Sequence, residues 1–172
     1  MTKIINLYGA PGSGKSTGAA YIFSKLKLKN INCELVTEYA KDKVYEGSTE
    51  VFKNQVYIFG KQYFRIFKLL DKVDYIITDS PLSLSLMYNQ QEFIEDELGA
   101  LVSKIYNSMN NMNYLVKRVK PYNSSGRFQD EVESDVLAKG FEDWLKYHWI
   151  DFQKVNGDES GYKTIINEIQ NV

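Results

Sequence analysis

The chain has 172 residues and a formal net charge of −1, so it has no overall electrostatic attraction to nucleic acid or to a membrane surface. Its single cysteine, Cys33, excludes an internal disulfide, and no apolar run approaches the roughly 20 residues of a membrane span. A hydrophobic fraction of 44% over this length predicts one domain that spans residues 1–172. The chain begins with a predicted strand and not with a signal peptide, so we expect the protein in the cytoplasm.

A glycine-rich loop follows the first predicted strand. Residues 3–8 form a short apolar run suited to a buried parallel strand, and residues 9–16 read Gly-Ala-Pro-Gly-Ser-Gly-Lys-Ser. This is the complete G-x-x-x-x-G-K-[ST] pattern of a phosphate-binding loop. Apolar residues between 19 and 26 then recur at helical spacing. Because strand, loop and helix in this order are the context that the pattern requires, we expect the loop to bind a nucleoside triphosphate.

Each part of the loop has a chemical task. Its glycines let successive backbone N–H groups point into one anion-sized hollow, which the positive end of the following helix also faces. Lys15 is expected to contact the β- and γ-phosphates, and Ser16 to ligate Mg²⁺. The residues predicted to contact the nucleotide are Gly9, Ala10, Gly12, Ser13, Gly14, Lys15, Ser16 and Thr17.

The second predicted strand, 33–37, is followed by an acidic residue. Ligands of open parallel sheets gather beyond the carboxyl ends of the strands, so we expect Glu38 to lie in the same crevice as the phosphates. A kinase needs a carboxylate there to accept the proton of the attacking hydroxyl. Glu38 is therefore a candidate catalytic base, and Glu38 and Tyr39 are candidates for binding the acceptor. The alternative is an acid exposed to solvent at a strand end.

A long aromatic helix is predicted over residues 51–72. Gln55 and Gln62 are seven positions apart and therefore share one face of it, where their amides can hydrogen-bond the edge of an acceptor base. The aromatic side chains of this helix are better explained as an ordinary apolar core face.

The third predicted strand, 74–78, is followed by Asp79-Ser80-Pro81. A carboxylate directly after an apolar strand is where proteins with this type of loop place the acid of the magnesium shell. We therefore expect Asp79 and Ser16 to hold Mg²⁺ together. The alternative is an aspartate that caps a turn or helix before Ser-Pro.

A helix over 92–109 and a fourth strand over 114–119 precede a basic, turn-rich segment. Residues 117–130 contain the cations Lys117, Arg118, Lys120 and Arg127. We expect this segment to form a lid that closes over the triphosphate, with Arg118 and Arg127 stabilising charge on the transferring phosphoryl group. The alternative is a basic loop exposed to solvent.

The last predicted elements are a helix over 129–147, a strand over 150–155 and a closing helix over 162–169. Five apolar runs alternating with helices predict an α/β fold with a five-stranded parallel sheet flanked by helices. Gly157 follows the fifth strand and would let the backbone approach a flat ring, so it is a candidate contact for adenine; a plain turn is the alternative.

Together these residues resemble small kinases with a phosphate-binding loop. The loop, Glu38-Tyr39-Ala40, Asp79-Ser80-Pro81, the basic lid and Val155-Asn156-Gly157 follow one another as in the nicotinamide riboside kinase-like group of AAA-type P-loop proteins. The chain is more loosely similar to deoxynucleoside kinases and to phage kinases that phosphorylate hydroxymethylated pyrimidines in DNA. The resemblance implies a P-loop NTPase fold, and in deoxynucleoside kinases the acid matching Glu38 is the base. Their Asp-Arg-Ser after the third strand differs from Asp79-Ser80-Pro81 here.

These features give a leading hypothesis: a kinase that uses ATP, or GTP, with Mg²⁺ to phosphorylate a hydroxyl of a nucleoside, nucleotide or nucleoside-like acceptor. One alternative acceptor is a hydroxymethylated pyrimidine flipped out of DNA. Another alternative is a nucleotide-switched module that hydrolyses ATP or GTP slowly and has no acceptor. The many Asn, Lys and Tyr residues suggest a phage or low-GC bacterial source, with the host cytoplasm as the location in the phage case. The sequence gives no oligomeric state.

Overall fold

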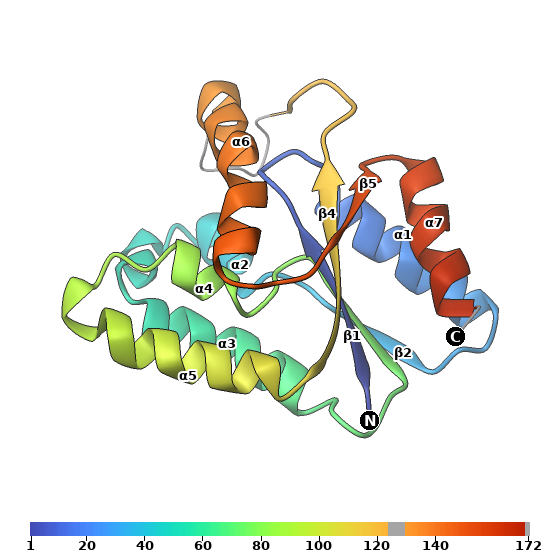
Figure 1. The fold of residues 1–172 in the computed structure, drawn as a ribbon, viewed down its shortest axis with the longest axis horizontal. Helices are drawn as coiled ribbons and strands as arrows, with labels where there is room; N and C mark the ends of the chain where they lie inside the picture. The colour runs from blue at the N-terminus through green and yellow to red at the C-terminus, as the bar shows by residue number, and fades with distance from the viewer. Residues whose placement is uncertain (124–129, 171–172) are drawn as a thin grey trace.

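The computed structural model describes residues 1–123 and 130–170. A twisted sheet runs through the molecule, with helices against both of its faces (Figure 1). All of its strands are parallel, and their order across the sheet is β2-β3-β1-β4-β5. The strands are β1 (Lys3–Tyr8), β2 (Cys33–Val36), β3 (Tyr75–Thr78), β4 (Asn110–Lys117) and β5 (Gln153–Asn156). The predicted α/β class and five-stranded parallel sheet are therefore confirmed.

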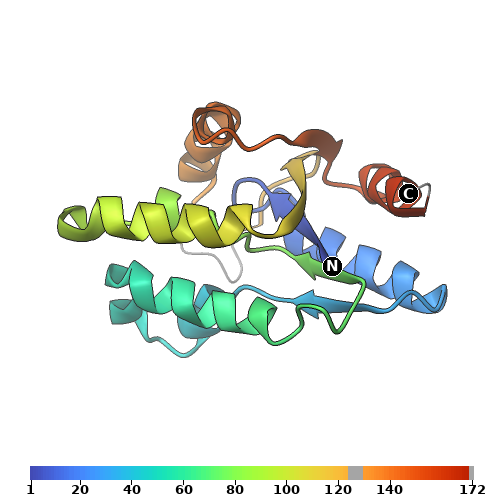
Figure 2. The ribbon, with the colours of Figure 1, turned by 60° about the horizontal axis from the view of Figure 1, so that its bottom comes forward.

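Helices connect successive strands and form two layers around the sheet. They are α1 (Lys15–Leu28), α2 (Tyr39–Tyr45), α3 (Gln55–Phe67), α4 (Leu84–Met87), α5 (Glu95–Asn107), α6 (Glu131–Tyr147) and α7 (Glu159–Gln170), with 3₁₀ turns at Thr49–Lys53 and Glu92–Ile94. Helices α1 and α7 pack side by side on one face, and α3 and α5 lie together away from them (Figure 2). Within the described residues, no helix is both long and apolar enough to cross a membrane.

The central strand β1 contributes side chains to both cores. Ile5 and Leu7 pack with α1 and α7, whereas Ile4 and Tyr8 pack with α3, α5 and α6. Successive side chains of a strand point to opposite faces, so a strand covered on both faces must be apolar throughout. This explains why residues 3–8 are recognisable from the sequence as a buried parallel strand.

The parallel register brings the ends of the strands to one edge of the sheet. Asn6 of β1 lies opposite Thr78 of β3 and Asn113 of β4. Val36 of β2 also lies opposite Thr78, and Lys117 of β4 lies opposite Asn156 of β5. The segments that follow these strands therefore emerge at the same edge. They begin at residues 9, 37, 79, 118 and 157.

The predicted helix over 51–72 is shorter than expected. The Asn54 side chain accepts a hydrogen bond from the Tyr57 N–H at 3.1 Å and so caps a new helix, α3, separating it from the preceding 3₁₀ turn. Helix α3 ends at Phe67, and Asp71 then adopts a positive φ of 59°. The short helices α2 and α4 were not predicted.

Strand β4 begins at Asn110, four residues before its predicted start at 114. The Asn6 side-chain amide donates to the side-chain oxygens of Asn111 at 2.8 Å and Asn113 at 3.0 Å. These bonds allow polar residues to lie within the sheet, where an apolar pattern could not reveal them. Strand β5 starts later than predicted, because a turn with Trp149 at a positive φ of 55° first closes helix α6.

Candidate functional site

The glycine-rich loop joins the end of β1 to the start of α1. Gly9, Gly12 and Gly14 have φ values of 142°, 80° and 106°, which residues with side chains rarely adopt. Gly14 is also the N-cap of α1 and carries no side chain that could cap the first helical turn. The amide groups of that turn and of the loop are therefore the groups suited to an anion.

The polar side chains of the loop lie close to its backbone. The Lys15 Nζ donates to the Gly9 carbonyl at 2.6 Å and to the Ala10 carbonyl at 3.1 Å, which places the ammonium over the loop. Ser13 is 2% exposed, and its hydroxyl has no hydrogen-bond partner in the described part of the chain. A buried hydroxyl without a partner is costly, and a bound phosphate would be one way to satisfy it. Ser16 and Thr17 at the start of α1 are exposed.

Lys15, Glu38 and Asp79 come together at the carboxyl edge of the sheet. The backbone N–H of Glu38 donates to Asp79 Oδ1 at 3.1 Å, and Asp79 is 4% exposed. Burial raises the pKa of the Glu38 carboxyl, and the charge of Lys15 lowers it while that of Asp79 raises it further. The carboxyl of Glu38 therefore lies within electrostatic reach of both the loop lysine and the acid after β3.

Helix α3 holds the segment that carries Glu38 through side-chain hydrogen bonds. The Gln62 side-chain oxygen accepts the Tyr39 N–H at 2.9 Å, and its nitrogen donates to the Thr37 carbonyl at 3.4 Å. Gln55 donates to the Phe52 carbonyl at 3.3 Å. Both glutamines are buried and bond to backbone groups. Their predicted contact with an acceptor base stays a prediction.

Three tyrosines are connected to the segment around Glu38. The hydroxyls of Tyr39 and Tyr57 are 2.7 Å apart, which joins α2 to α3. Burial, and then the charge of Glu38, raises the pKa of Tyr88 to about 12, so Tyr88 also lies near that carboxyl. No sequence pattern indicates Tyr88, because the short helix α4 that precedes it carries too few residues to show a period.

The part of the predicted lid that the structure describes is held by α6. Arg118 forms ion pairs with Glu131 at 3.2 Å and with Asp135, and its guanidinium lies 5.4 Å from the ring centre of Tyr122. Arg118 is thus bound to carboxylates of α6. Arg127 lies outside the described residues, so the structure says nothing of its place.

Gly157 packs directly against the glycine-rich loop. Its N–H donates to the Lys117 carbonyl at 2.7 Å, and a Cβ at this position would lie 1.9 Å from the Ser13 carbonyl oxygen. A side chain is therefore sterically excluded, which gives the glycine a packing role between β5 and the loop. Its predicted contact with adenine stays a prediction.

Replacing Gly157 with alanine should lower the free energy of unfolding by about 3 kcal/mol, because the Ser13 carbonyl cannot move without distorting the loop. Gly140→Ala in α6 is the matched control, since its Cβ would meet nothing within 4 Å and a helical alanine stabilises by up to about 1 kcal/mol. Urea denaturation of both variants is the measurement. A Gly157→Ala protein as stable as Gly140→Ala would contradict the steric argument.

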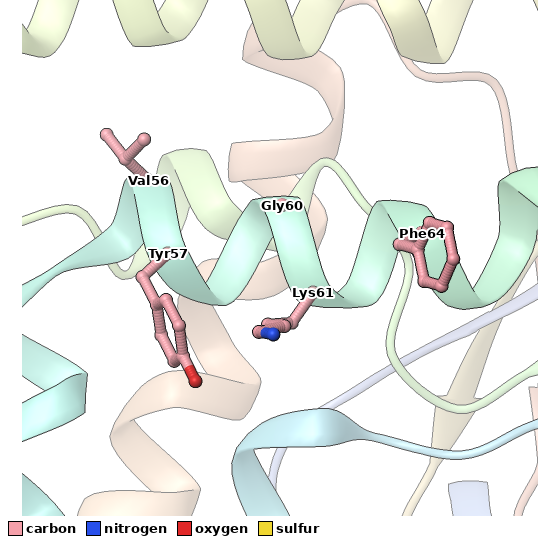
Figure 3. A pocket seen from close by; sticks show the side chains of 5 residues that line it. All are labelled: Val56, Tyr57, Gly60, Lys61 and Phe64. Atoms are coloured by element: carbon pink, nitrogen blue, oxygen red, sulfur yellow. The ribbon is translucent and has the colours of Figure 1, made fainter.

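A surface hollow lies along helix α3, and none of its lining residues is one of the predicted site residues. It has a volume of about 320 Å³ and is lined by Val56, Tyr57, Gly60, Lys61 and Phe64, all on α3. Figure 3 shows Tyr57 and Lys61 on one side of the helix and Val56 on the other, so the hollow follows the outer surface of a single helix. Among the described residues, no group of three or more His, Cys, Asp or Glu side chains is placed to hold a metal ion.

Two solved structures of deoxyadenosine kinase from M. mycoides are similar to this chain. One, with dATP bound, has a TM-score of 0.63 and 19% identity, and the match covers 96% of this chain and 98% of that one. The other, with dCMP as product and a flexible dCDP, has a TM-score of 0.59 and 20% identity, covering 98% and 100%. No family model and no curated protein matches the chain. The likeness establishes a shared fold, in agreement with the looser similarity to deoxynucleoside kinases.

Proposed function

We propose that this chain is a kinase that transfers the γ-phosphate of ATP to a hydroxyl of a nucleoside or a related acceptor. The observation that carries the proposal is the convergence of Lys15, Glu38 and Asp79 at one edge of the sheet. A module that only binds and slowly hydrolyses a nucleotide has no acceptor hydroxyl, and so it has no need of a carboxylate such as Glu38 to receive an acceptor proton. A kinase needs one to receive the proton of its acceptor.

The donor side of the site is formed by the loop. Lys15 would exchange the carbonyls of Gly9 and Ala10 for the β- and γ-phosphates, since a phosphate is the stronger partner of an ammonium. The Ser16 hydroxyl and the Asp79 carboxylate are oxygen donors of the kind Mg²⁺ takes, and they would hold it together with substrate phosphates and waters. The ion, when bound, would neutralise charge on the phosphates.

On the acceptor side, Glu38 orients and deprotonates the hydroxyl. The hydroxyl oxygen forms a bond to the γ-phosphorus, the bond from that phosphorus to the β–γ bridging oxygen breaks, and the hydroxyl proton passes to the Glu38 carboxylate. The raised pKa makes this carboxylate a better proton acceptor than an ordinary glutamate. Tyr39 and Tyr88 are proposed to line the acceptor pocket, with Gln62 holding the Glu38 segment in place.

A nucleoside is the acceptor we favour. The two similar structures are kinases of deoxyadenosine in which nucleotides are bound, and the match extends over nearly all of both chains. We also propose that residues 1–172 form one kinase domain whose lid is the basic segment 117–130. Arg118 would then leave the carboxylates of α6 and contact the triphosphate when the lid closes.

The direct test incubates the protein and Mg²⁺ with γ-labelled ATP or GTP and separate panels of acceptors. The panels contain nucleosides, nucleotides, nicotinamide riboside, and plain or hydroxymethylated DNA. Label in a nucleoside supports the proposal, and omission of Mg²⁺ should remove it. Label that enters only DNA would identify a different acceptor, and release of inorganic phosphate alone across every panel would refute a kinase.

Arg118→Ala should lower kcat by about a hundredfold, because a cation that stabilises transferring charge is removed. The free energy of unfolding should change by less than about 1 kcal/mol, since the ion pairs of Arg118 involve exposed acids. Lys139→Ala, at an exposed position of α6 outside the lid, is the control and should keep kcat. Equal rates for the two variants would remove Arg118 from the transfer step.

A further inference from the structure

The phosphate-binding loop is held from outside by two hydroxyl groups of the last third of the chain. Ser134 of α6 donates a hydrogen bond to the Pro11 carbonyl at 2.6 Å, and Tyr162 of α7 donates one to the Gly14 carbonyl at 2.9 Å. Ser134 is 1% exposed and Tyr162 is 3% exposed. Two buried side chains from different helices thus bond to carbonyl groups at two points of the loop.

The position of the Tyr162 hydroxyl is fixed by its ring. A Cβ added at Gly18 would lie 2.5 Å from that ring, so the ring packs flush against the backbone of α1. A Cβ at Gly14 would lie 2.5 Å from the Tyr162 hydroxyl oxygen itself. The absence of side chains at Gly14 and Gly18 therefore lets the tyrosine approach the start of α1 closely enough to bond there.

The direction of a carbonyl decides the direction of the next N–H. A peptide group is planar and trans, so its C=O and its N–H point in opposite directions. The Pro11 carbonyl shares its peptide group with the Gly12 N–H, and the Gly14 carbonyl shares its group with the Lys15 N–H. The bond from Ser134 therefore turns the Gly12 N–H away from α6. The Gly14 carbonyl accepts both the Gly18 N–H at 2.8 Å and the Tyr162 hydroxyl, and together these bonds turn the Lys15 N–H away from α7.

We propose that Ser134 and Tyr162 are positioning residues that orient the backbone N–H groups of Gly12 and Lys15 toward a bound nucleoside triphosphate. An anion site made of backbone N–H groups depends on their direction, and groups fixed before the ligand arrives need no reorganisation on binding. The contact of Gly157 with the Ser13 carbonyl supports the loop at a point between the two hydrogen bonds. This inference rests on the proposed function, because it concerns the same phosphate-binding site.

The test compares Tyr162→Phe, Ser134→Ala and the double variant with a matched control, Tyr21→Phe. The Tyr21 hydroxyl donates to Glu159 at 3.0 Å, so it also joins α1 to α7 but does not bond to the loop. Dissociation constants for ATP and for inorganic tripolyphosphate are measured at a temperature where circular dichroism shows every variant fully folded. A lower affinity then reports the loop itself and not the folded fraction.

We expect Tyr162→Phe and Ser134→Ala each to raise both dissociation constants about fivefold, which corresponds to the loss of one hydrogen bond. The double variant should raise them further. The KM for ATP should rise equally, with the KM for the acceptor unchanged, whereas Tyr21→Phe should match the wild type. Wild-type affinity for ATP and tripolyphosphate in both Ser134→Ala and Tyr162→Phe would overturn this inference and leave the proposed function standing. Failure of the wild-type protein to bind either probe would overturn both.

Discussion

Lys15→Ala should abolish phosphoryl transfer, with kcat reduced by about a thousandfold or more, because a cation contacting the transferring group is worth that much in comparable sites. The Lys15 ammonium lies over the loop, 2.6 Å from the Gly9 carbonyl. The side chain belongs to neither hydrophobic core, so its removal should leave the fold intact. Transfer of label from γ-labelled ATP to a nucleoside is the measurement.

Lys25→Ala is the matched control for this change. Lys25 is an exposed lysine on the same helix, α1, and lies over the ring of Tyr21, away from the loop glycines. Its loss should leave kcat unchanged. A Lys15→Ala protein that keeps a tenth or more of the wild-type kcat would show that the loop lysine does not act on the transferred phosphate.

Glu38→Gln should lower kcat by about a hundred- to ten-thousandfold while the dissociation constant for ATP stays unchanged, since a general base is removed and the loop is untouched. In the wild-type protein, kcat should rise with pH through the raised pKa of Glu38, because only the ionised carboxylate accepts the proton. The glutamine variant should lose this pH dependence. Unchanged turnover in Glu38→Gln would remove the residue from the mechanism.

The same substitution should stabilise the folded protein at neutral pH. Burial raises the pKa of Glu38 in the folded state above its ordinary value of 4.5, so folding favours the protonated carboxyl. The stability that this provides is fully present below the ordinary pKa and is lost as the pH rises through the raised one. Urea denaturation should therefore show that the free energy of unfolding of Glu38→Gln, relative to the wild type, increases as the pH rises from the ordinary to the raised pKa of Glu38.

Glu34→Gln is the control for both measurements on Glu38. Glu34 lies on β2, four residues earlier, and forms a half-exposed ion pair with Lys27 at 3.0 Å. Its neutralisation should change stability by less than about 1 kcal/mol and leave kcat and its pH dependence as they are. A stability gain in Glu34→Gln equal to that in Glu38→Gln would show a general charge effect and not the burial of one carboxyl.

Local patterns in the sequence were enough to predict the fold class and the glycine-rich loop between β1 and α1. The strand at residues 3–8 and the loop after it are recognised from consecutive residues. The spacing of apolar residues distinguishes strands from helices. Patterns that depend on side-chain hydrogen bonds were missed. The cap at Asn54 shortened α3, and the bonds from Asn6 extended β4 into a polar stretch.

The surroundings of the candidate site depend on contacts between distant positions, which no local pattern contains. Glu38 and Asp79 were both predicted at strand ends, but the bond between them joins residues 41 apart in the sequence. Gln62 was predicted to face an acceptor base, and the structure shows its amide bonded to the backbone around Tyr39. Arg118 was predicted to face phosphates, and the structure shows it paired with acidic residues of α6. How close α6 lies to the end of β4 depends on the tertiary fold and cannot be predicted from sequence spacing.

The hydroxyl groups that bond to the glycine-rich loop are synthesised long after the loop itself. Ser134 follows its partner Pro11 by 123 positions, and Tyr162 follows Gly14 by 148. A nascent chain that contains the complete loop sequence therefore still lacks both hydrogen bonds until α6 and α7 have left the ribosome and docked. Binding of a nucleoside triphosphate should consequently appear only after α6 and α7 have been synthesised, and it would report that these two helices have packed in place.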